Sequence, residues 1–200
     1  MSKSQVAADL TLRFPARWPS RVITVLGAPG SGKTALLQAW AAAWRGRVLR
    51  LQGTPGIQGI DIARILDGQL NPEADAQAWD SRSPNKLLEA LASRPTLLLF
   101  DNGEFVTEPT LLEGGTAFLR DQPASTVVVI AGRRLPPLRW SKLRLSGRLV
   151  EFGPNDLHRA TVDKDPFPHD SVRRDLAFGW AEGTRILAQA PDPVDADTLS

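Results

Sequence analysis

The sequence contains no cysteine, which excludes disulfides, thiolate metal sites and cysteine nucleophiles. Its two histidines, His158 and His169, are too few to predict a zinc site. No apolar run approaches the roughly 20 residues that a membrane-spanning helix needs. Residues 1–10 lack the basic segment followed by an apolar one that marks a secretion signal. We therefore expect a soluble, cytoplasmic protein without membrane contact.

A strong excess of charge of either sign is also missing. The 24 basic and 22 acidic residues give a formal net charge of +2, which is too small to indicate nucleic-acid binding by itself. The hydrophobic fraction of 42% is that of a folded globular domain. The 200 residues suffice for one sizeable core, or for a main domain with a small appendage.

Apolar runs typical of strands alternate with segments typical of helices. Predicted strands cover residues 22–26, 48–51, 96–100, 126–131 and 148–152. Predicted helices cover residues 34–44, 60–70, 84–92 and 110–120. This alternation predicts an α/β fold, a three-layer sandwich with a mainly parallel five-stranded sheet. The apolar runs over residues 22–26, 97–100 and 127–130 are expected at its centre.

A glycine-rich motif lies between the first predicted strand and the first predicted helix. It matches the P-loop pattern G-x-x-x-x-G-K-[ST], and the predicted phosphate-binding residues are Gly27, Ala28, Pro29, Gly30, Ser31, Gly32, Lys33, Thr34 and Ala35. The glycines let backbone amides approach phosphate oxygens, and the helix directs its positive end toward them. Lys33 is expected to reach the β- and γ-phosphates and Thr34 to ligate Mg²⁺. The predicted cofactors are therefore ATP and Mg²⁺.

A second part of the predicted site follows the strand over residues 96–100. Asp101 at its end is the expected partner of Thr34 in holding Mg²⁺. Hydrolysis also needs a group that orients or deprotonates water. The next residue is Asn102, whose amide orients water but does not accept its proton at neutral pH. Glu104 is a nearby carboxylate and a candidate for this role, at an unusual spacing. Binding is thus a firmer prediction than turnover.

A pair of arginines, Arg133 and Arg134, follows the strand over residues 126–131. This strand is expected to lie between the P-loop strand and the Asp101 strand. A cation at its end would then face the γ-phosphate. Arg133 or Arg134 could sense that phosphate or stabilise transferred charge, although a solvated basic turn explains the pattern about equally well.

The order of these motifs resembles that of the STAND ATPases, and in particular their maltose-regulator (MalT-type) branch, which drives LuxR-type transcription factors. The resemblance rests on the P-loop, on Asp101, on the segment from Val127 to Leu138 with its Arg and Pro-Pro-Leu, and on the Gly-Trp segment at Gly179. It implies an ASCE/AAA-like P-loop NTPase fold and an ATP-dependent switch that self-associates or binds a protein partner. The family usually has a second Asp where this chain has Asn102.

The chain divides into three predicted regions. Residues 1–20 form an N-terminal segment, residues 21–155 the nucleotide-binding core, and residues 156–200 a linker with a small helical appendage. The sensor repeats and helix-turn-helix of the family are not found in these residues. A transcription-factor role is therefore not predicted for them directly.

Three other functions remain open at this stage. One is a small-molecule kinase or nucleotide transferase on the same scaffold, and another is a scaffold that binds ATP without hydrolysing it. The third is a DNA-associated AAA-type ATPase, which a stretch of basic residues suggests without establishing nucleic-acid binding. That stretch consists of Arg139, Lys142, Arg144 and Arg148.

Overall fold

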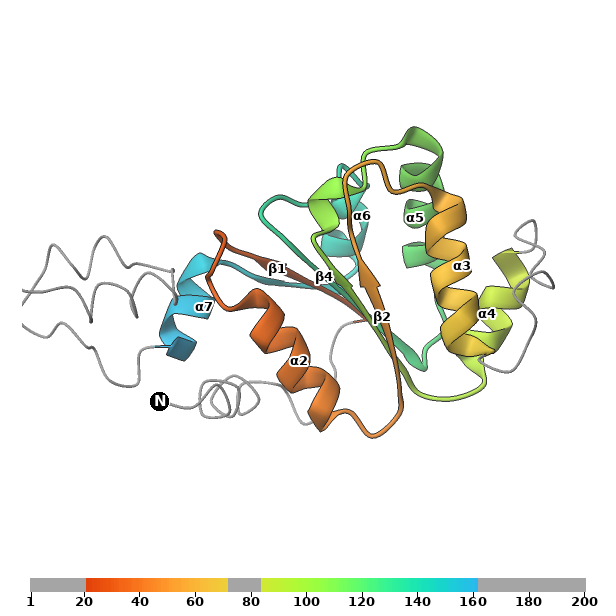
Figure 1. The fold of residues 1–200 in the computed structure, drawn as a ribbon, viewed down its shortest axis with the longest axis horizontal. Coiled ribbons are helices and arrows are strands. Elements are labelled where there is room, and N and C mark those ends of the chain that lie inside the picture. Colours follow the sequence, from red (N-terminus) through yellow and green to blue (C-terminus); the bar gives the residue numbers. More distant parts are fainter. Residues whose placement is uncertain (1–20, 72–83, 162–200) are drawn as a thin grey trace, which may run out of the picture.

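A five-stranded parallel sheet forms the centre of the protein (Figure 1). The computed structural model describes residues 21–71 and 84–161. The strands are β1 (Val22–Leu26), β2 (Arg47–Gln52), β3 (Thr96–Asp101), β4 (Thr126–Gly132) and β5 (Leu149–Phe152). Their order across the sheet is β2-β3-β4-β1-β5, and all four neighbouring pairs are parallel. The predicted fold class is confirmed.

The most apolar strands occupy the middle of this sheet, as predicted. Every residue of β4 is buried, and β1 and β3 each have only one residue that is not. Strands of a parallel sheet are buried on both faces, so they consist of continuous apolar runs. The edge strands β2 and β5 have shorter apolar runs and are more exposed. The position of β4 between β1 and β3 is also confirmed.

Helices cover both faces of the sheet. They are α2 (Lys33–Ala43), α3 (Gly59–Leu70), α4 (Pro84–Ala92), α5 (Pro109–Asp121), α6 (Trp140–Leu145) and α7 (Pro154–Thr161). Helices α2 and α7 lie on one side of the sheet, and α3 to α6 lie on the other (Figure 1). Alternate strand residues point to opposite faces, so Leu97 and Leu99 pack beneath α2, whereas Leu98 packs toward α3 and α5.

Local hydrogen bonds fix where two of the helices begin. The carboxylate of Glu108 accepts from the backbone amides of Thr110 (3.1 Å) and Leu111 (3.0 Å), and Pro109 occupies the first turn of α5. Gln58 and Asp61 form a reciprocal capping box at the start of α3. Each cap satisfies amides that have no partner within the helix. Both helices pack over the β2-β3-β4 part of the sheet.

Several short elements differ from the prediction. A 3₁₀ turn, η1 (Gly103–Phe105), follows β3, and α6 and α7 were not predicted as helices at these positions. The predicted end of the core at residue 155 falls inside α7, whose Leu157 is 1% exposed and packs in the core beneath α2. The predicted N-terminal segment and most of the predicted linker and helical appendage lie outside the described residues. Among the residues described, no helix has the length and apolar character needed to cross a membrane.

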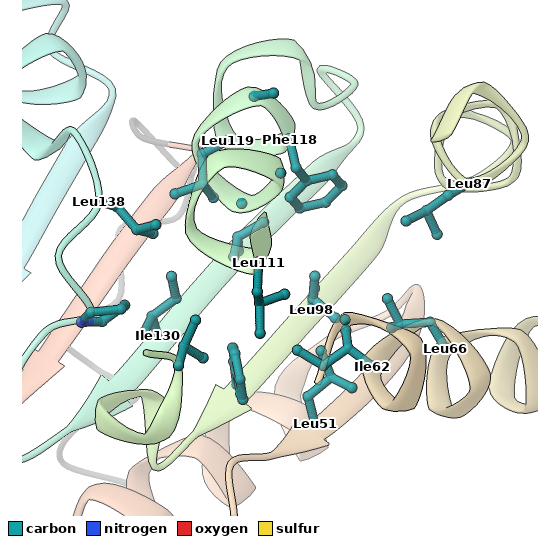
Figure 2. A pocket seen from close by; sticks show the side chains of 18 of the residues that line it. Leu51, Ile62, Leu66, Leu87, Leu98, Leu111, Phe118, Leu119, Ile130 and Leu138 are labelled. Atoms are coloured by element: carbon teal, nitrogen blue, oxygen red, sulfur yellow. The ribbon is translucent and has the colours of Figure 1, made fainter. Parts of the chain in front are cut away.

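The face covered by α3, α4 and α5 contains an apolar cavity of about 440 Å³ (Figure 2). Leu51, Leu98 and Ile130 line it from the sheet, and Ile62, Leu66, Leu87, Leu111 and Phe118 line it from the helices. None of its lining residues belongs to the P-loop at 27–34. The cavity and the candidate phosphate site are therefore separate features of the domain.

Candidate functional site

The P-loop connects β1 to α2 at the carboxyl end of the sheet. Gly30 (φ 75°) and Gly32 (φ 90°) both adopt the left-handed conformation that glycine tolerates best. The first α2 hydrogen bond runs from the amide of Leu36 to the carbonyl of Gly32 at 2.9 Å. No side chain caps this helix. The amides of its first turn therefore remain available to an anion, as in a phosphate-binding loop.

Gly27 has no room for a side chain. A Cβ atom at this position would lie 2.4 Å from Ser31 Oγ and 2.7 Å from Leu157 Cδ1. The loop thus folds over its own first residue, and Leu157 of α7 packs against that turn. Leu157, which the sequence analysis did not assign to the site, therefore supports the loop from a distant part of the chain.

The Lys33 side chain lies along the inside of the loop. Its Nζ donates to the carbonyl oxygens of Gly27 and Ala28, both at 2.8 Å. Burial lowers the pKa of Lys33 below its ordinary value, and the nearby carboxylates of Asp101 and Glu104 partly offset this effect. The ammonium thus lies beside the loop backbone, where phosphate oxygens would compete with the two carbonyl groups.

Thr34 and Asp101 meet across the site, although 67 residues separate them in sequence. Thr34 Oγ1 donates to Asp101 Oδ2 at 2.7 Å, and the amide of Asn102 donates to Asp101 Oδ1 at 2.9 Å. A hydroxyl and a carboxylate side by side are oxygen ligands of the kind that Mg²⁺ takes together with water. No cluster of three His, Asp or Glu suited to a metal occurs within residues 21–71 and 84–161. The donor set fits a magnesium ion that also has water and phosphate ligands.

Asn102 turns the chain sharply at the end of β3. It is the only non-glycine residue with positive φ (55°) in the part of the chain that the structure describes. Asn adopts this conformation more readily than most residues, because its short side chain tolerates the left-handed region. Gly53 approaches this turn closely, because a Cβ at Gly53 would lie 2.2 Å from Asn102 O. The Asn102-Gly103 dipeptide is a turn signal that would have predicted it.

Glu104 and Arg133 form an ion pair between the ends of β3 and β4. Glu104 Oε1 accepts from Arg133 Nε at 2.7 Å, and Oε2 accepts from the backbone amide of Arg133 at 3.1 Å. The Glu104 side chain is 5% exposed and that of Arg133 is 53% exposed. The sequence analysis named both residues for separate roles and did not predict their contact.

The remaining predicted site residues lie where the motif places them. Ala28, Pro29 and Gly30 form the exposed rim of the loop, Ser31 is buried inside it, and Ala35 is half-buried in the first turn of α2. Arg134 is exposed beside Arg133. The structure therefore brings the P-loop, Asp101, Asn102, Glu104 and Arg133 to one edge of the sheet. The chemical role of each residue stays a prediction.

Two of the four cations in the basic stretch that suggested DNA binding make contacts within the protein. Arg144 forms a two-point ion pair with Glu151 at 2.7 and 2.8 Å. Arg148 donates to the carbonyl oxygens of Arg120 and Leu119, both at 2.9 Å. Only Arg139 and Lys142 of the four cations have exposed side chains without such contacts among the described residues. The stretch therefore provides little free positive charge.

Comparisons with known proteins add relatives by sequence. No family model matches the chain. The transcriptional regulator MalT of Klebsiella pneumoniae is 25% identical over 194 residues, which covers 84% of this chain and 22% of MalT. MalT of Cronobacter sakazakii is 29% identical over 195 residues with the same coverage. Both are HTH-type regulators, and the chain spans about a fifth of their length.

Two solved structures show a weaker likeness. A DNA replication initiation factor is 18% identical with a TM-score of 0.45, covering 92% of this chain and 54% of that one. AMPPCP-bound DnaA from Aquifex aeolicus is 17% identical with a TM-score of 0.45, covering 93% and 55%. The fold assignment rests on the sheet order and the P-loop described above. The chain is thus a P-loop α/β domain whose sequence is similar to that of MalT, as the resemblance of its motifs predicted.

Proposed function

We propose that this domain binds ATP together with Mg²⁺ at the P-loop and acts as a nucleotide-dependent switch. The observation that carries the proposal is the 2.7 Å contact between Thr34 Oγ1 and Asp101 Oδ2. It joins the P-loop to the acid of β3 at the place where a magnesium-bound triphosphate would lie. The similarity to MalT supports a regulatory role, which the whole chain would exert through a protein partner or through self-association.

In this proposal each part of the site has a defined task. The first-turn amides of α2 bind phosphate oxygens, and Lys33 exchanges its two carbonyl contacts for the β- and γ-phosphates. Thr34 and Asp101 would hold Mg²⁺, which offsets phosphate charge when it is bound. Arg133 directly follows β4, which lies between the P-loop strand and the Asp101 strand, and is the residue proposed to sense the γ-phosphate.

Nucleotide titration tests binding directly. We expect Lys33→Ala to weaken MgATP binding about tenfold or more, because a charge-assisted contact to phosphate is lost. Lys86→Ala removes the same charge from the exposed surface of α4 and is the matched control. Equal affinities of the wild type and both variants would contradict the proposed site.

Light scattering with ATP and with ADP tests the switch. A switch predicts a mass, or a complex with partner, that differs between the two nucleotides. A small-molecule kinase predicts no such difference and predicts instead that a phosphoryl group appears on an acceptor. Identical masses with the two nucleotides, combined with phosphoryl transfer to an acceptor, would contradict the switch and support the kinase.

We further propose that hydrolysis is slow because Asn102 occupies the position after Asp101. Asn102→Asp is a suitable test, since Asp also tolerates the left-handed conformation found there (φ 55°). The substitution should raise the single-turnover rate, because a carboxylate accepts a proton from water and a neutral amide does not. Equal rates for the wild type and the variant would remove Asn102 as the reason for slow turnover.

A further inference from the structure

The backbone at the ends of β3 and β4 brings Glu104 and Arg133 into contact. A Cβ at residue 132 would lie 2.5 Å from Glu104 Oε2, and a Cβ at residue 103 would lie 2.7 Å from Ile130 Cγ2. Glycine at both positions therefore allows the η1 turn to approach β4 closely enough for the Glu104 carboxylate to reach the Arg133 amide. Such close packing makes this pair different from a surface salt bridge, in which two mobile side chains meet in solvent.

On the Arg133 guanidinium, Glu104 binds Nε and leaves the two terminal nitrogens available. Its two oxygens accept from Nε and from the backbone amide of Arg133, so both the side chain and the main chain of that residue are held. Within the described residues, neither terminal nitrogen of Arg133 donates to an acceptor, and the side chain is about half exposed. A guanidinium held at Nε still presents a planar pair of terminal nitrogens, which suits a phosphate group.

The arginine belongs to the same charged cluster as the P-loop lysine. The pKa of Lys33 is lowered by burial, raised by the charges of Asp101 and Glu104, and lowered by that of Arg133. Asp101, Glu104 and Arg133 thus each act electrostatically on Lys33 at the carboxyl end of the sheet. An anion bound by Lys33 would lie within the field of Arg133.

The environment of Glu104 makes it a weak base. Burial raises the pKa of its carboxyl group, but the hydrogen bonds from the Arg133 side chain and from the backbone outweigh this effect, and the pKa falls below its ordinary value. A carboxylate that takes a proton from water works best with a pKa nearer neutrality and with a free oxygen. Both oxygens of Glu104 already accept hydrogen bonds from Arg133.

We propose that Glu104 is a positioning residue, which fixes Arg133 so that its terminal nitrogens contact the γ-phosphate, and that it is not the base of hydrolysis. This inference rests on the proposed ATP site. The preference for ATP over ADP would then depend on two residues. Arg133 contacts the γ-phosphate, and Glu104 orients the Arg133 side chain. Gly132 then also has a function, since any larger residue there would displace the Glu104 carboxylate.

The test is a double-mutant cycle on the ratio of the ADP and ATP dissociation constants, measured by titration with magnesium. The four proteins are the wild type, Glu104→Gln, Arg133→Ala and the double variant, with Glu113→Gln on the exposed face of α5 as the matched control. We expect Arg133→Ala to reduce the preference for ATP about tenfold, because a charge-assisted contact is lost. Glu104→Gln should reduce it about threefold, and the double variant should match Arg133→Ala.

Other outcomes would overturn the assignment. If Glu104 were the base, Glu104→Gln would abolish single-turnover hydrolysis while it left the ATP preference unchanged. Effects of the two substitutions that multiplied fully would also show that they act separately. If Glu104→Gln failed to fold, Arg133→Lys would decide, because it keeps the charge but lacks the Nε–H that Glu104 holds. An unchanged ATP preference in that variant would contradict the proposal.

The same titrations separate this inference from the function on which it rests. A wild-type protein that bound neither nucleotide would remove the ATP site itself, and with it the role of Glu104. A wild-type protein that bound ATP and ADP equally well would leave the site in place and contradict only the role of the pair.

Discussion

The two faces of the sheet are packed to different degrees. Beneath α2, the side chains of Leu36, Leu37 and Trp40 are at most 4% exposed and pack against the central strands. The opposite face, beneath α3, α4 and α5, contains the cavity of about 440 Å³. The helix that carries Lys33 and Thr34 is therefore held closely to the sheet, whereas the cavity lies away from the P-loop. Close packing is thus found beneath the helix whose side chains are proposed to bind the nucleotide.

Truncating one buried leucine on each face should show this difference most strongly. We expect Leu36→Ala to lower the free energy of unfolding by about 4 kcal/mol, because it opens a new cavity in the close-packed face. Leu66→Ala enlarges a cavity that already exists, so we expect a loss of about 2 kcal/mol. Urea unfolding measures both values. Equal losses would indicate that the faces are equally well packed.

A larger side chain in the core should have opposite effects on stability on the two faces of the sheet. Ala41→Leu on α2 should cost about 1–3 kcal/mol, because the side chain has no space in a close-packed core. Ala63→Leu on α3 extends into the cavity and should be neutral or stabilise by about 1 kcal/mol. Thermal unfolding of the two variants makes the comparison. A large destabilisation by Ala63→Leu would show that the cavity is not available to a side chain.

A smaller gain is expected from a glycine that lines the cavity. A Cβ at Gly114, in the middle of α5, would meet no atom within 4 Å. Gly114→Ala should therefore stabilise the protein by about 0.4–1 kcal/mol, chiefly by restricting the unfolded chain. Gly103→Ala places its methyl group 2.7 Å from Ile130 Cγ2 and should instead destabilise it. A loss of stability in Gly114→Ala would contradict the open space seen at that helix.

The smallest expected effect is the change of stability with pH that comes from Glu104. The pKa of Glu104 in the folded protein lies below its ordinary value of 4.5, so its ion pair contributes stability that is present above pH 4.5. That contribution is lost as the pH falls through the lowered pKa. The difference in unfolding free energy between the wild type and Glu104→Gln should thus shrink below pH 4.5. A difference that stayed constant from pH 7 to pH 3 would show that this ionisation does not contribute.

Sequence reasoning predicted the parts of this domain that local patterns determine. The apolar runs of β1, β3 and β4 identified the central strands, and the motif at Gly27 to Thr34 identified the loop between β1 and α2. Asp101 was predicted as a magnesium ligand from its place at the end of an apolar strand, and the structure places it beside Thr34. These features depend on composition and spacing within a few residues of one another, so a single sequence contains the necessary information.

The contacts between distant segments could not be predicted in the same way. Glu104 and Arg133 meet because η1 packs against the end of β4, which depends on the space left by Gly103 and Gly132. Leu157 reaches Gly27 because α7 returns to the sheet beside α2. Helix α6 has only six residues, too few for a helical period to be recognised. Tertiary packing decides each of these cases.

Amide hydrogen exchange with and without MgATP tests the central claim most directly, because it reports on both faces of the sheet in one experiment. The account predicts slower exchange over residues 27–35, where loop and first-turn amides would bind phosphate, and unchanged exchange over α5 beside the cavity. Protection confined to α5, or no protection of the loop at saturating MgATP, would contradict the claim that these amides form the nucleotide site.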